Sequence, residues 1–299
     1  MKKLLYLSAV ALLMSACGQK EDSKKPTQEQ PVQVTKDISG DVADASMPQD
    51  LSVKPNKDTI EPQMSVLKLK EGKPLDFSQF YGGGKTMEEK VVAQIDSIRN
   101  MAEQGDAKSQ YAYGVCYEKG WGVEQDVKEA LEWYTKAAGQ GNVPAYNSLG
   151  NFYRTGLGVN ADPDAAFKWY KKGAEEKDNQ AMLNLGNCYY YGMGTEKDVN
   201  IAIKWWKEAA DAGNAFAMAQ MGDCYYSGIG VEKDLAKAIE YYKPAADNNV
   251  YNALYRLGVL YYTGNGVEQD KTYAELLMRK ARDGGMKEAQ AFLDTYFKK

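Results

Sequence analysis

The spacing of glycine, tyrosine, aspartate and alanine divides most of the chain into equal units. From Gly105 onward the same residue types recur every 36 positions, without an insertion, through five units. Self-similarity at such a period is typical of helical repeat arrays. The columns are glycine (Gly114, Gly150, Gly186, Gly222, Gly258), tyrosine (Tyr117, Tyr153, Tyr189, Tyr225, Tyr261), two loop glycines (Gly120, Gly156, Gly192, Gly228, Gly264; Gly122, Gly158, Gly194, Gly230, Gly266), aspartate (Asp126, Asp162, Asp198, Asp234, Asp270) and alanine (Ala130, Ala166, Ala202, Ala238, Ala274).

Each unit is predicted to form two helices joined by a glycine loop. Asp106, Asn142, Asp178 and Asn214 stand at the start of the first helix and can accept hydrogen bonds from its unpaired N–H groups. The first helix should stop at the first loop glycine, which adopts the left-handed conformation without steric cost. The aspartate column then caps the second helix.

Two local features modify this pattern. Pro244 lies late in the second helix of unit four, where we expect a kink or an early helix end and a shifted junction with unit five. An aromatic stripe in the second helices, including Trp133, Tyr134, Trp169 and Tyr170, is predicted to be core. One helix pair cannot bury this surface alone, so neighbouring units must stack.

The pattern resembles the Sel-one-like repeat, a relative of the tetratricopeptide repeat. Unit two, "AYNSLGNFYRTGLGVNADPDAAFKWYKKGA" (Ala145 to Ala174), shows the resemblance well. The resemblance implies an all-α fold: an α-solenoid of stacked antiparallel helix pairs wound as a right-handed superhelix. The expected organisation is a signal peptide (1–16), a lipidated cysteine with a flexible linker (17–85), a capping helix (86–104), five repeats (105–284) and a second capping helix (285–299).

In such solenoids the first helices line the concave face, which is where we expect a partner to bind. The first-helix positions that the core does not use form one helical stripe. We call it the first-helix stripe; its side chains suit peptide backbone or glycan hydroxyls, and the alternative is a merely solvated face. Its members are Ser148, Asn151, Gln180, Asn184, Asn187, Tyr191, Phe216, Gln220, Asp223, Asn252 and Arg256.

The amino-terminal residues predict export and a lipid anchor. Lys2 and Lys3 precede an apolar run too short to span a membrane, which is typical of a signal peptide. Ser15 and Ala16 before Cys17 resemble the lipobox of bacterial lipoproteins, so Cys17 is the expected lipidation site and membrane contact. Gly18, which follows the cysteine, favours the outer membrane by the same resemblance, on its periplasmic or cell-surface face. The polar stretch that follows cannot bury enough apolar area to fold.

Several kinds of chemistry are excluded or unsupported. The chain has no histidine, which removes the commonest general base and the usual zinc motifs. "GGGKT" (Gly82 to Thr86) fails as a phosphate loop because Gln79 stands where a glycine is required. With 37 Lys and Arg against 41 Asp and Glu, interspersed along the chain, no basic patch indicates nucleic acid. No metal, cofactor or catalytic residue is predicted.

Three cysteines share one inward-facing column: Cys116, Cys188 and Cys224. Equivalent positions of neighbouring helix pairs should lie about 9–10 Å apart, beyond the roughly 7 Å reach of a disulfide. We expect buried free thiols. Some cysteine-rich members of the resembled family carry a disulfide in each unit and were linked to penicillin binding or hydrolysis, and that paired pattern is absent here.

These features predict a lipid-anchored, non-enzymatic scaffold that binds an envelope protein or peptide on its concave face. A peptidoglycan- or glycan-binding module is the main alternative. A β-lactam or amide hydrolase is a further alternative that would require a catalytic cluster in one unit. The oligomeric state and the partner's identity stay open.

Overall fold

The computed structural model describes residues 67–68, 74–75 and 87–297. The predicted signal peptide, Cys17 and most of the predicted linker fall outside the described residues. Within that linker, strand β1 (Leu67–Lys68) pairs antiparallel with strand β2 (Pro74–Leu75), with Leu67 opposite Leu75.

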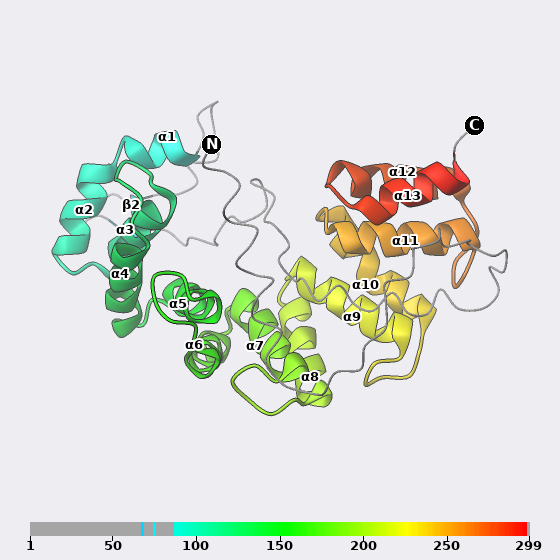
Figure 1. Cartoon of the computed structure of the whole chain (residues 1–299), viewed down its shortest axis with the longest axis horizontal. Helices are drawn as coiled ribbons and strands as arrows, with labels where there is room; N and C mark the ends of the chain where they lie inside the picture. The colour runs from blue at the N-terminus through cyan, green and yellow to red at the C-terminus, as the bar shows by residue number, and fades with distance from the viewer. Residues whose placement is uncertain (1–66, 69–73, 76–86, 298–299) are drawn as a thin grey trace, which may run out of the picture. The chain divides into compact units, whose positions relative to one another are not determined.

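The repeat region consists of five helix pairs followed by one further helix (Figure 1). Each first helix makes its largest set of contacts with the second helix of its own unit, and each second helix then packs against the next first helix. This confirms the predicted α-solenoid. The pairs are α3 (Ala107–Lys119) with α4 (Val127–Gly139), α5 (Val143–Thr155) with α6 (Pro163–Glu175), α7 (Asn179–Tyr191) with α8 (Val199–Asp211), α9 (Ala215–Ser227) with α10 (Leu235–Asp247), and α11 (Tyr251–Thr263) with α12 (Lys271–Asp283).

All ten repeat helices have the same length, 13 residues, and all but one of them begin at a side-chain cap. The predicted first-helix caps each accept a backbone N–H, as Asn142 does from Ala145 at 3.2 Å and Asp178 from Ala181 at 2.7 Å. The aspartate column caps every second helix in the same way. In unit five, Val250 replaces the first-helix cap and provides no side-chain hydrogen bond.

The two loop glycines perform different tasks. The first ends the first helix in the left-handed conformation, with φ between 71° and 74° in all five units. The second docks the loop on the preceding unit: a Cβ at Gly194 would lie 2.2 Å from the carbonyl oxygen of Pro163 in α6. A Cβ at Gly158 would lie 2.9 Å from the carbonyl oxygen of Val127 in α4. A side chain here would push neighbouring units apart.

The structure departs from the predicted amino-terminal cap, because residues 86–104 do not form one helix. Helix α1 (Met87–Val92) ends and α2 (Ile95–Glu103) begins within two residues. The amide of Gln94 donates to the carbonyl of Val91 at 2.9 Å, three residues back, which interrupts the α-helical ladder. At the other end, α13 (Lys287–Tyr296) lies within the predicted carboxyl-terminal cap.

The expected effects of Pro244 on the end of α10 and on the next junction are wrong. Helix α10 ends at Asp247 and is as long as α8. The following turn has the regular pattern: Val250 N–H donates to Ala245 at 3.0 Å, as Asn214 N–H does to Ala209 at 2.9 Å. Pro244 lies in the last turn, where its ring removes one helical hydrogen bond, and burial of Ala245 and Ala246 holds the helix together around it.

The turn between units requires a left-handed residue, and glycine supplies it in most units. Gly105, Gly141, Gly213 and Gly285 have φ between 81° and 93° at this position. Lys177 and Asn249 occupy the same position with φ of 62° and 57°. A residue with a Cβ pays a steric cost in this region, least for asparagine.

Lys177→Gly should therefore stabilise the protein. We expect a gain of about 0.5–1 kcal/mol, because relief of left-handed strain exceeds the greater unfolded-state freedom of glycine. Urea denaturation followed by circular dichroism measures it. Gly213→Lys, the reverse change at the equivalent position, should destabilise, and a loss of stability in Lys177→Gly would contradict the interpretation.

Candidate partner-binding face

In units one to four, the core contains an aromatic ring of the second helix that packs against a glycine of the first helix. A Cβ at Gly150 would be 2.4 Å from the ring of Tyr170, and a Cβ at Gly222 would be 2.5 Å from Tyr242. The corresponding distance from Gly186 to the Trp206 ring is 2.5 Å. These rings are among the largest fully buried side chains. Any other residue in the glycine column would displace the ring that joins the two helices.

The polar atom of each buried ring has a hydrogen-bond partner in the first helix. The Tyr170 hydroxyl donates to Asn151 Oδ1 at 2.7 Å, and the Trp206 indole N–H donates to Asn187 Oδ1 at 3.1 Å. The Tyr242 hydroxyl donates to Asp223 Oδ1 at 2.6 Å. Each acceptor directly follows the glycine on which its ring lies. These three members of the first-helix stripe therefore satisfy buried donors of the core.

Units one and five meet the same requirement differently. In unit one the position after the glycine is Val115, and the Tyr134 hydroxyl donates instead to Glu118 Oε2 at 2.7 Å. In unit five Met278 replaces the aromatic residue and Val259 replaces the acceptor. In unit one the Tyr134 hydroxyl thus has an acceptor from a different position of the first helix. In unit five Met278 carries no donor, and the residue after the glycine, Val259, is apolar.

Other members of the stripe are also engaged within the fold. Gln180 Oε1 accepts from Asn214 of the next unit at 3.3 Å, and Asn184 donates to Asn147 of the preceding unit at 2.8 Å. Burial raises the pKa of Tyr111 to about 12, and the nearby Ser148 side chain acts in the opposite direction. Phe216 and Gln220 are half-buried, and Tyr191 is 40% exposed. The structure thus leaves aromatic surface, more than free amides, on this face.

The remaining members gather around one carboxylate between units four and five. Asp223 Oδ2 accepts from Asn252 at 3.0 Å, and Oδ1 lies 3.6 Å from Arg256 Nε. Burial raises the pKa of the Asp223 carboxyl, although its hydrogen bonds and the Arg256 charge act in the opposite direction. Tyr226 lies under the guanidinium, with 5.1 Å from its ring centroid to Arg256 Cζ.

Comparison with known families identifies the repeat from which the five units are built. The Sel1 repeat model matches at residues 107–142, 143–178, 179–214, 215–250 and 252–286, more than half of the chain. The chain belongs to the Sel1 repeat family. Sel1 repeat proteins are generally scaffolds for protein–protein interaction.

Two solved structures support the assignment. The Sel1 repeat protein from Oxalobacter formigenes is 31% identical, with a TM-score of 0.63 over 70% of this chain and 90% of its own. The c5321 protein, a protective antigen of uropathogenic Escherichia coli strains with an SLR fold, is 33% identical with a TM-score of 0.61. That match covers 72% of this chain and only 45% of c5321. The comparison with curated proteins gave no match.

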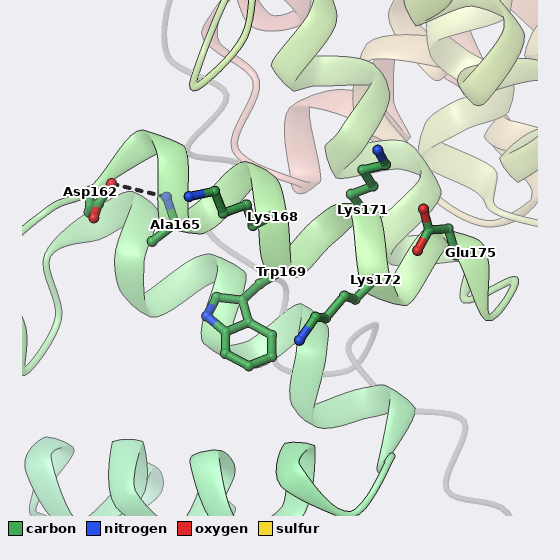
Figure 2. A pocket seen from close by; sticks show the side chains of 7 residues that line it. All are labelled: Asp162, Ala165, Lys168, Trp169, Lys171, Lys172 and Glu175. Carbon is green, nitrogen blue, oxygen red and sulfur yellow. Dashed lines mark hydrogen bonds between the residues drawn. The ribbon is translucent and has the colours of Figure 1, made fainter.

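A hollow on α6 that the sequence pattern did not predict is also present in this chain (Figure 2). Its lining residues are Asp162, Ala165, Lys168, Trp169, Lys171, Lys172 and Glu175. Lys172 Nζ lies 4.5 Å from the Trp169 ring centroid, and that ring stacks on Tyr146 at 5.9 Å. Trp169, predicted to be core as part of the aromatic stripe, is partly buried and packs against the core as well as lining this hollow.

The cysteine column is confirmed as buried and free of disulfides. Cys116, Cys188 and Cys224 are free thiols, and burial raises the pKa of each to about 12. A thiol with so high a pKa is a poor nucleophile at neutral pH. Within the described part of the chain, no group of three or more potential metal ligands occurs. In the same part, every helix is too short or too polar to cross a membrane.

Gly150→Ala should destabilise the Sel1 domain strongly. We expect a loss of about 2 kcal/mol or more, since the methyl group would overlap the buried Tyr170 ring. Gly139→Ala is the matched control, because a Cβ there meets nothing within 4 Å. The control should be neutral or stabilise by up to about 1 kcal/mol. Urea denaturation measures both, and equal effects would refute the ring-on-glycine account.

Proposed function

We propose that this protein is a lipid-anchored scaffold of the bacterial outer membrane. It binds a protein partner, through a peptide segment, on the surface formed by the first helices of the units, which carries the first-helix stripe and is called the first-helix face below. The observation that carries this proposal is contact between first helices of successive units, α5 with α7 and α9 with α11. Side chains from different units thereby form one surface that an extended segment can follow. Family membership supports a binding role over catalysis.

The hydrogen-bond pattern favours a peptide over a glycan. Glycan recognition would draw on free amides and carboxylates, but Asn151, Asn187 and Asp223 already accept from buried rings. The exposed ring of Tyr191, in edge contact with Tyr190 at 4.9 Å, and the half-buried Phe216 provide apolar area instead. Aromatic residues supply much of the binding energy at protein interfaces.

The anchor rests on the sequence alone. The lipobox-like residues before Cys17 support lipidation of that cysteine after removal of the signal peptide. Several acyl chains anchor a protein stably, because each buried CH₂ contributes about 0.8 kcal/mol. The residues after Cys17 would then link the Sel1 domain to the membrane.

A photo-crosslinking amino acid tests the binding face. With p-benzoylphenylalanine at Phe216 in the full chain, irradiation of intact cells should give a defined adduct that mass spectrometry identifies. The same group at Lys204, exposed on second helix α8, is the control and should give none. Equal labelling from both positions would contradict a partner on the first-helix face.

Cys17→Ser tests the anchor separately. The variant should leave the membrane fraction and become soluble after cell lysis, whereas Cys188→Ser, which alters a buried thiol, should stay with the membrane. Immunoblotting of fractionated cells measures both. Retention of Cys17→Ser in the outer membrane would refute lipid anchoring at this residue.

A further inference from the structure

Arg256 on α11 is the least exposed of the arginines that form ion pairs in the described part of the chain. Its side chain retains 19% of its accessibility, against 35–54% for Arg99, Arg279 and Arg282. It belongs to the first-helix stripe. An enclosed guanidinium normally has its N–H groups paired, because unpaired buried donors are costly.

Arg256 does not meet that requirement. Its Nε is buried without a hydrogen-bond partner, and 3.6 Å to Asp223 Oδ1 is too long for a hydrogen bond. Both Asp223 oxygens already accept from closer donors, Tyr242 and Asn252. Asp223 therefore attracts the guanidinium by its charge and leaves the Nε–H group without a hydrogen bond.

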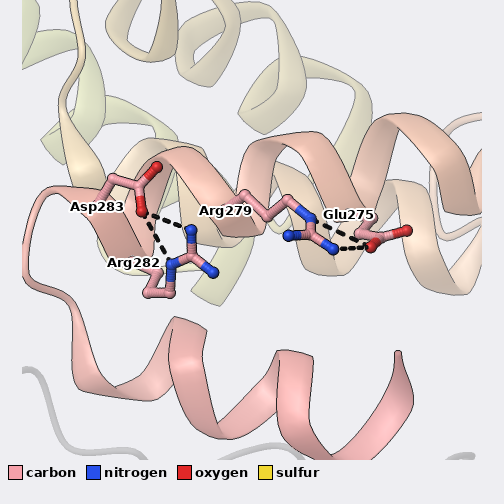
Figure 3. A network of polar contacts seen from close by, with 4 residues as sticks. All are labelled: Glu275, Arg279, Arg282 and Asp283. Atoms are coloured by element: carbon pink, nitrogen blue, oxygen red, sulfur yellow. Dashed lines mark hydrogen bonds and ion pairs between the residues drawn. The ribbon is translucent and has the colours of Figure 1, made fainter. Parts of the chain in front are cut away.

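Two arginines of α12 show what a satisfied guanidinium looks like in this protein (Figure 3). Arg279 donates through Nε and Nη2 to Glu275 Oε1 at 3.2 and 2.7 Å. Arg282 donates in the same way to Asp283 Oδ1 at 2.9 and 2.6 Å. The more exposed arginines thus have carboxylate acceptors, and the enclosed Arg256 has none among the described residues.

The neighbouring Tyr226 ring positions the guanidinium without accepting a conventional hydrogen bond from it. The Arg256 Cζ lies 5.1 Å from the Tyr226 ring centroid, a cation–π contact on the helix before it. The face continues beyond it in both directions. Burial, together with the Tyr190 and Asp223 charges, raises the pKa of Tyr191 on α7. On the other side, the ring centroids of Tyr255 and Phe292 of α13 are 6.3 Å apart.

We propose that Arg256 is the carboxylate-binding residue of the first-helix face and takes the side chain of an aspartate or glutamate within a segment of the protein partner. The planar guanidinium fork matches a carboxylate in shape and charge. Since the face continues on both sides of Arg256, the segment passes across it, which favours an acidic side chain over a chain terminus. This inference rests on the proposed function and names the partner's chemistry.

Peptide pools test the inference without knowledge of the partner. The full chain, immobilised, is offered two pools of random decapeptides, acetylated and amidated at their ends, with a fixed central glutamate or glutamine. Mass spectrometry counts the retained peptides. The glutamate pool should be enriched roughly tenfold, the ratio expected for one charge-assisted hydrogen-bond pair.

Variants identify the residue responsible. Arg256→Gln should abolish the enrichment and Arg256→Lys should reduce it, because lysine retains charge but loses the fork. Arg279→Gln removes the same charge from α12 and should leave the enrichment intact. If Arg256→Gln loses its helical circular dichroism, the arginine Nε–H NMR signal of the unmodified chain decides instead: one signal should shift with the glutamate pool and not with the glutamine pool.

The inference would be overturned by equal retention of both pools, by enrichment that persists in a folded Arg256→Gln, or by the lack of an arginine signal that responds to glutamate alone. Stronger enrichment of a third pool, with central glutamine and a free terminal carboxylate, would also overturn it. The Phe216 crosslink keeps the two proposals distinguishable. A specific adduct without glutamate enrichment would leave the scaffold function standing and remove only the role of Arg256.

Discussion

The contact between a buried aromatic ring and a bare glycine determines the architecture of each central repeat. The ring of Tyr170, Trp206 or Tyr242 reaches the first helix because no Cβ occupies the space above the glycine. Proximity then creates a second requirement, since a buried hydroxyl or indole N–H needs an acceptor. The residue after the glycine supplies it, so that two adjacent residues of the first helix serve one side chain of the second.

This coupling explains why part of the structure could be predicted from the sequence and part could not. The columns identified the helices, their caps and their loop glycines, because each depends on local backbone chemistry. The hydrogen-bond partners could not be predicted from these columns. Periodicity shows which face of the helix carries Asn187, but it does not show that the Trp206 indole reaches Asn187 from the next helix. Unit one illustrates the limit: Glu118, one turn further along, accepts the Tyr134 hydroxyl. The penalty expected for Pro244 was also overridden by packing of the alanines that follow it.

The same coupling changes the functional interpretation of the first-helix face. Amides that suggested recognition instead form hydrogen bonds with neighbouring repeats, Asn184 with the preceding one and Gln180 with the next. What remains for a partner is aromatic surface and one guanidinium without a hydrogen-bond acceptor. An extended acidic segment with apolar residues fits this combination. The proposed lipid anchor lies in a different part of the chain and is tested independently of the binding face.

A double-mutant cycle between Asn187 and Trp206 tests the central claim most directly. The account predicts that Asn187→Val lowers the free energy of unfolding by about 1–3 kcal/mol in the unmodified chain, where it strands the indole N–H. In a Trp206→Phe background, which has no ring donor, the same change should cost close to nothing, which gives a coupling energy of about 1 kcal/mol or more. Equal costs in the two backgrounds would show that Asn187 does not serve the core and would contradict the account.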